Sequence, residues 1–169
     1  MKLLIAFLAS DSELLESHIL NKAAAWVSGE KNPMIHVEAV FVDSESAGDV
    51  IGRSCSIHYG GKVFLDQKRF SRKQWRFRSV GLSDAAVRKA FAFCEAHVGE
   101  EFNKVGFFMQ PVVGSRRMSK DTWFCSEIVA GALRAAGMDV EESLHPHKLY
   151  TSLCDVTTPD CPRVTSLVF

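Results

Sequence analysis

The sequence predicts an α+β protein in which one antiparallel β-sheet packs against helices. Three observations lead to this prediction. Short segments with continuous or alternating apolar residues, which are typical of strands, lie at the start of the chain and again further along its first half. Longer segments with helical spacing lie between these two groups of strands and after the second group. The 169 residues suffice for one core. No Pro-, Gly- or Ser-rich linker or internal repeat divides them, so we expect a single domain over residues 1–169.

The opening segment, MKLLIAFLAS, is interpreted as a buried strand that leads directly into a helix. Ser10 and Glu13 have capping-box spacing, and Gly29 follows the last residue with helical periodicity. A short signal peptide is the alternative, but a single Lys precedes the apolar run and the polar helix begins at once. Five cysteines without paired short spacings fit reduced thiols, so a cytoplasmic location is expected.

Residues 34–43, MIHVEAVFVD, alternate and are rich in β-branched side chains, which predicts a strand. A period of two places His36, Glu38 and Val40 on one face of it. Residues 50–59, 62–66 and 74–80 then predict an antiparallel meander with a turn at Gly60 and Gly61.

The remaining elements are helices. Residues 83–99 begin with Ser83 as the cap and end at Gly99, with an inner stripe of Val87, Phe91, Cys94 and Val98. A loop over about 100–121 precedes a helix from about Trp123 to Ala136, which its run of small residues would let pack closely on the sheet. Pro146 is expected to start a last short helix.

Cys125 lies in the first turn of the predicted Trp123–Ala136 helix. Unpaired N–H groups and the helix dipole favour the thiolate there, and the thiolate is the nucleophilic form of cysteine. His36 and Glu38, two residues apart on one strand face, have the arrangement of a general base and the carboxylate that orients it. A buried structural cysteine and a hydrogen-bonded pair within a sheet are the alternatives that these patterns leave open.

Charge and composition restrict the partners. Twenty basic and twenty acidic residues cancel, which argues against a generic nucleic-acid partner, and no apolar run approaches the roughly 18 residues of a membrane span. A non-catalytic binding module remains an alternative, because Trp75 and Phe77 interleave with a basic cluster of Lys68, Arg69, Arg72, Lys73, Arg76 and Arg78. The other explanation for this cluster is charge that solvates an edge strand.

No cofactor or metal is expected. His145, His147, Cys154 and Cys161 are residue types that can bind zinc, but they lack the usual Cys-x-x-Cys and His-x-x-x-His spacings.

Several segments together resemble the circularly permuted NlpC-type branch of the papain-like cysteine hydrolases, close to YiiX-type and large-DNA-virus members and to the lecithin retinol acyltransferase relatives. In this group the histidine strand precedes the cysteine helix. The matching segments are LLIAFLASDSELLESHIL, IHVEAVF, SCSIHYGGKVFLDQKRFSRKQWRFRSV, EEFNKVGFF, WFCSEIVAGALRAAGM and HPHKLYTSL.

The resemblance implies a permuted papain-like fold, with Cys125 as the nucleophile, His36 as the base and Glu38 as the third residue. Ser56 or His58 on the following strand could take the place of Glu38. The implied activity is hydrolysis of a peptide or isopeptide amide through an acyl-enzyme, with a peptide-like or acyl substrate. A lipid acyl hydrolase or acyltransferase is the alternative on the same fold. The sequence carries no signal for the oligomeric state.

Overall fold

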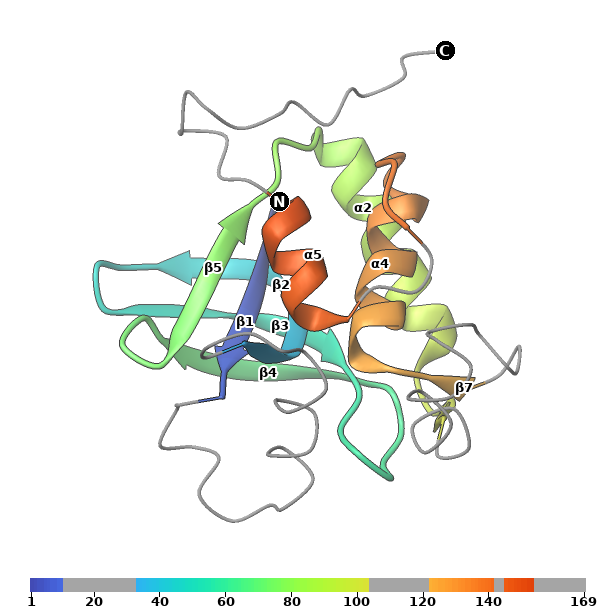
Figure 1. Ribbon diagram of the computed structural model, residues 1–169. Helices are drawn as coiled ribbons and strands as arrows, with labels where there is room; N and C mark the ends of the chain where they lie inside the picture. The colour runs from blue at the N-terminus through green and yellow to red at the C-terminus, as the bar shows by residue number, and fades with distance from the viewer. Residues whose placement is uncertain (11–32, 104–121, 142–144, 154–169) are drawn as a thin grey trace.

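The computed structural model describes residues 1–10, 33–103, 122–141 and 145–153 (Figure 1). Its main feature is a five-stranded antiparallel sheet in the order β4-β3-β2-β1-β5. Helices lie along one side of this sheet, which confirms the α+β prediction. The five strands are β1 (Lys2–Ala9), β2 (Met34–Glu45), β3 (Asp49–Ser56), β4 (Phe64–Ser71) and β5 (Trp75–Ser79). The other elements are α2 (Asp84–His97), the two-residue strands β6 (Glu101–Phe102) and β7 (Thr122–Trp123), α4 (Cys125–Ala135) and α5 (Pro146–Ser152).

The opening segment forms β1, as the strand interpretation predicted. It lies between β2 and β5, and the run from Leu3 to Leu8 is buried throughout. A strand that is covered on both faces needs apolar side chains at successive positions, which explains why β1 lacks alternation.

The predicted meander is correct for β2, β3 and β4 but wrong for the last strand. β5 pairs with β1 and not with β4, although only residues 72–74 separate β4 from β5. Two strands joined so closely can occupy opposite edges of a sheet only if the sheet curls until its edges approach each other. Ring contacts between Phe70 of β4 and both Trp75 and Phe77 of β5 show this approach.

Curling divides the apolar side chains into two clusters. A small cluster fills the inner face of the sheet, with Phe70 at its centre, and Trp75 and Phe77 pack on it; its buried members are Leu4, Ala6, Val40, Val50 and Phe70. The large core lies between the outer face and the helices, and includes Phe7 and Phe41. Along β2, His36, Glu38 and Val40 share the inner face, as the alternation predicted.

Helix α2 begins as expected, because the Ser83 side chain accepts a hydrogen bond from the Ala86 N–H at 3.3 Å. It ends before Gly99, whose φ of 92° suits glycine. Cys94 is fully buried, as predicted, but Val98 is 50% exposed. The assignment of Val98 to the inner stripe is therefore wrong, because the helix has already ended at that residue.

Helix α4 begins two residues later than predicted. Trp123 belongs to β7, and Phe124 is the N-cap, with its N–H donating to the Glu127 carboxylate at 2.8 Å. A Cβ at Gly131 would lie 2.6 Å from the Phe93 ring. Gly131 therefore brings α4 close to α2, and the helix also packs against β2 and β3, as its run of small residues predicted.

Helix α5 starts at Pro146, as predicted. The helix predicted to follow Ser10 and most of the loop predicted over 100–121 lie outside the described residues. Among the helices described, none has the length and apolarity that crossing a membrane requires.

Candidate functional site

Cys125 is the first residue of α4, and the two residues before it are fixed by backbone and ring contacts with β6. β7 pairs with β6, where Phe102 lies opposite Trp123, and the Asn103 N–H donates to the Trp123 carbonyl at 3.1 Å. The Phe124 ring packs edge-on against Phe102, with a centroid distance of 5.5 Å. These contacts fix where the helix starts and leave Cys125 half-buried at its N-terminal end.

His36 lies near the start of β2, and its side chain is 15% exposed. Helix α5 holds this end of the strand, because the Met34 N–H donates to Nδ1 of His147 at 3.3 Å. The ring of His36 packs edge-on against the ring of Trp75 of β5, with a centroid distance of 6.2 Å. The position of the imidazole is thus defined by elements that are distant in the sequence.

Glu38 is buried, and three side chains hydrogen-bond to its carboxylate. Oε1 lies 3.2 Å from Nε2 of His36 and 3.2 Å from Nζ of Lys68, while Oε2 accepts from the Ser54 hydroxyl and lies 3.2 Å from the same Nζ. Burial alone would raise the pKa of Glu38. The hydrogen bond and charge of His36, with Lys68 and Ser54, outweigh burial and lower this pKa to about 2.

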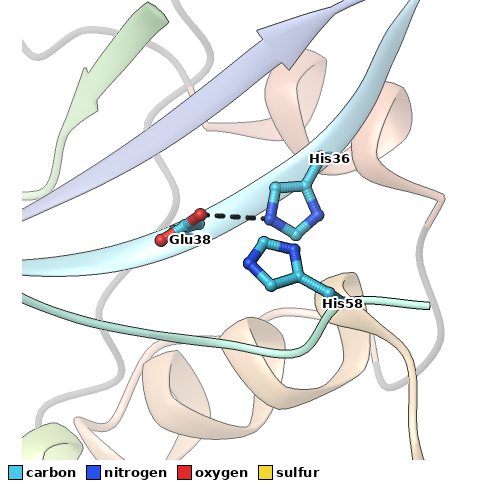
Figure 2. A group of neighbouring side chains, drawn as sticks. All are labelled: His36, Glu38 and His58. Atoms are coloured by element: carbon cyan, nitrogen blue, oxygen red, sulfur yellow. Dashed lines mark hydrogen bonds and ion pairs between the residues drawn. The ribbon is translucent and has the colours of Figure 1, made fainter. Parts of the chain in front are cut away.

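The pKa of His36 shifts in the opposite direction. Burial lowers it, but hydrogen bonds to Cys125 and Glu38 and the charges of both groups outweigh burial and raise it to about 9. Figure 2 shows Nε2 directed at Glu38 and the other ring nitrogen on the far side of the ring. The structure therefore brings together all three predicted site residues, Cys125, His36 and Glu38.

The two alternative third residues make other contacts. The Ser56 hydroxyl donates to the Val37 carbonyl at 2.7 Å. The His58 ring stacks on His36 with a centroid distance of 5.1 Å and an interplanar angle of 25°, and it stacks on Phe64 at 4.9 Å. Among the contacts of His36 within the described residues, Glu38 is the group hydrogen-bonded at Nε2, and His58 lies against the ring face.

Donor atoms of His36, Glu38 and His58 lie within 4.8 Å of one another, which is compatible in distance with a metal site (Figure 2). The orientation of the two rings is not compatible with a metal site. Imidazole lone pairs lie in the ring plane, so two rings stacked at 25° do not direct them at one ion. Lys68 also neutralises the carboxylate that such an ion would need. The cluster is not arranged as a preformed metal centre.

Sequence reasoning missed two residues of the site, Ser54 and Lys68. Ser54 is fully buried in β3, and its alternation with Ser56 at the end of that strand was the available signal. Lys68 was grouped with the basic cluster. Its contact with Glu38 depends on how β2, β3 and β4 pair, and the sequence alone does not show that register.

The rest of the basic cluster contacts acidic and aromatic side chains. Arg72 pairs with Glu45 and lies over the Phe77 ring at 5.1 Å from its centroid. Arg78 lies over the Tyr150 ring at 4.0 Å. Trp75 and Phe77 pack on Phe70 in the inner cluster.

The two histidines of the zinc site that the sequence spacing disfavours lie at the start of α5. Nδ1 of His145 accepts from the His147 N–H at 3.3 Å, which caps α5. Cys154 and Cys161 lie outside the described residues.

No protein-family model, curated protein or solved structure matches this chain. The permuted papain-like fold thus remains a prediction based on the motifs.

Proposed function

We propose that this protein is a cysteine-dependent hydrolase that cleaves an amide bond through an acyl-enzyme, with Cys125 as the nucleophile, His36 as the general base and Glu38 as the orienting carboxylate. One observation carries the proposal. The His36 ring lies between a thiol at a helix N-terminus and a buried carboxylate, and it hydrogen-bonds to both.

This arrangement favours a thiolate–imidazolium pair. An imidazole whose pKa is about 9 is protonated at neutral pH, and Cys125 is the adjacent group that can supply the proton. Since Glu38 occupies Nε2, the proton from the thiol goes to Nδ1. The dipole at the start of α4 and the Cys125 N–H stabilise the sulfur anion.

Acylation then follows from these positions. The Cys125 thiolate attacks the substrate carbonyl carbon and forms a C–S bond, and the carbonyl π electrons move to oxygen. The Cys125 backbone N–H, unpaired within the helix, is placed to donate to that oxyanion. The oxyanion collapses, the C–N bond breaks, and the leaving amine takes the proton from the His36 imidazolium.

Deacylation uses the same groups. His36, now neutral, accepts a proton from water, whose oxygen attacks the thioester carbon. Collapse of this second intermediate breaks the C–S bond, releases the carboxylic acid and restores the thiolate–imidazolium pair. Glu38 stays ionised throughout, because its pKa of about 2 lies far below neutral pH.

The chain order supports the permuted papain-like assignment as part of this proposal. The histidine strand β2 precedes the cysteine helix α4, and α4 packs against β2 and β3. For the substrate we propose a peptide or isopeptide bond, in keeping with the resemblance.

The test is the rate at which iodoacetamide alkylates each cysteine near neutral pH, followed by peptide mass spectrometry. We expect Cys125 to react fastest, because it is half-buried at a helix N-terminus beside His36, whereas Cys55 and Cys94 are buried. The variant His36→Ala should slow this reaction, whereas Cys94→Ala, which alters a buried core thiol, should not. Faster labelling of Cys154 or Cys161 in the native protein would contradict the proposal.

A further inference from the structure

Two cations share one buried carboxylate in the proposed site. Nε2 of His36 and Nζ of Lys68 each lie 3.2 Å from the same oxygen of Glu38, so the two nitrogens cannot be further apart than twice that distance. When His36 is protonated, two positive charges therefore lie close together at a site where Glu38 is almost fully buried. Like charges at this separation disfavour each other, even though each is attracted to the carboxylate.

Lys68 is held in this position by a second contact. Its ammonium lies 3.9 Å from the centroid of the Phe64 ring, and Phe64 stacks on His58, which stacks on His36. The contacts form a closed circuit from Lys68 through Phe64, His58, His36 and Glu38 back to Lys68. The Lys68 side chain is 30% exposed, and its ammonium group is bound on two sides, so it is not a freely moving surface charge.

We propose that Lys68 is a positioning residue of this site: by sharing Glu38 with His36, it weakens the pull of that carboxylate on the imidazolium. This inference rests on the proposed function for its catalytic meaning, but its electrostatic content depends only on the shared carboxylate. Lys68 thereby sets the upper pH limit at which the thiolate–imidazolium pair survives.

Within the part of the chain that the structure describes, few other titratable groups lie around the pair. Helix α4 contributes Cys125, and the segment after β3 contributes His58, whose pKa is lowered by burial and by the charges of His36 and Lys68. His147 of α5 contacts the backbone of Met34. On the paired positions of β1, Ala6 lies opposite Glu38 and Leu8 opposite His36, so that strand adds no charge.

The experiment compares Lys68→Met with the native protein in two titrations. One is the pH dependence of Cys125 alkylation by iodoacetamide, and the other is the NMR titration of the His36 ring. In both titrations, the midpoint pH of His36 deprotonation should rise by about 0.5–1 pH unit in Lys68→Met, because one competing positive charge has been removed. Lys68→Arg should restore the native value, and Lys73→Met, at an exposed residue in the turn after β4, should leave it unchanged.

A lysine that merely supports Glu38 mechanically would behave differently. Replacing such a lysine would release the Glu38 carboxylate from His36, and the midpoint pH of the His36 titration would fall or stay unchanged. Either result overturns the inference. Circular dichroism checks folding, and Lys68→Gln, which removes the charge but keeps a donor, replaces Lys68→Met if that variant is unfolded. Slow labelling of native Cys125 would instead refute the proposed function, while the NMR shift would still decide the role of Lys68.

Discussion

Two histidines lie face to face in this protein, and their surroundings shift their pKa values in opposite directions. Burial lowers both values, but hydrogen bonds to Cys125 and Glu38 raise that of His36 to about 9. For His58, the nearby charges of His36 and Lys68 add to the lowering. The two rings are only 5.1 Å apart, so proximity to the site does not decide the protonation state. Hydrogen-bond partners decide it for His36, whereas burial and the neighbouring positive charges decide it for His58.

The backbone explains why the two rings have different partners. His36 stands on the inner face of β2 with Glu38 two residues further along, so a carboxylate lies in line with its ring edge. His58 lies two residues beyond the end of β3 and opens a turn, in which the Gly61 N–H donates to the His58 carbonyl at 3.0 Å. Gly60, with a φ of 70°, allows this turn, and the ring is left exposed against the face of His36.

The comparison is tested most directly by giving each histidine the same substitution. We expect His36→Asn to lower turnover of an activated ester such as p-nitrophenyl acetate by about 10³-fold, because the general base is lost. His58→Asn removes a neutral ring that stacks without a hydrogen bond to His36, and it should change turnover by less than about 5-fold.

The next largest effect is expected from Glu38→Gln. The amide keeps the shape of the side chain but removes the charge that orients and stabilises the imidazolium, so turnover should fall by about 10²-fold. The labelled residue should remain Cys125, and circular dichroism should show a retained fold. If Glu38→Gln is fully active while a His58 variant is inactive, His58 is the third residue and the assignment of Glu38 is wrong.

Glu38 and His36 should make the free energy of unfolding depend on pH in opposite ways. Glu38 has a lowered pKa, so its contribution is present above its ordinary value of 4.5 and is lost as the pH falls toward about 2. His36 has a raised pKa, so its contribution is present below 6.5 and is lost as the pH rises toward about 9. Urea unfolding of the native protein should therefore show maximal stability between these windows, and Glu38→Gln should flatten the acid side.

The sequence allowed the local part of this comparison to be predicted. A period of two placed His36 and Glu38 on one face, and a helix start placed an unpaired N–H next to Cys125. Both statements depend on residues within a few positions of each other. The start of α4 was misplaced by two residues, because Trp123 and Phe124 are compatible with a helix until the pairing of β6 with β7 is known.

The non-local part could not be predicted in the same way. β5 was expected beside β4, since tight turns usually join neighbours, but its pairing with β1 depends on a strand about 70 residues earlier. The contact of Lys68 with Glu38 crosses from β4 to β2 and follows from the same curled sheet. Alternation shows which face a side chain occupies, but it does not show which residues on other strands lie beside it.

The smallest expected effect comes from two serines that differ in what they donate to. Ser54 and Ser56 are both fully buried in β3; Ser54 donates to the Glu38 carboxylate and Ser56 to the Val37 carbonyl. At pH 6 we expect each serine-to-alanine change to lower the free energy of unfolding by about 1–3 kcal/mol, with the larger cost at Ser54 because its acceptor is charged. Only Ser54→Ala should raise the pH at which stability is lost on the acid side, because it removes a donor that favours ionised Glu38. Urea titrations between pH 2 and 6 would show this shift. An equal shift in Ser56→Ala would mean that the strand as a whole, and not the hydrogen bond to Glu38, sets the acid limit.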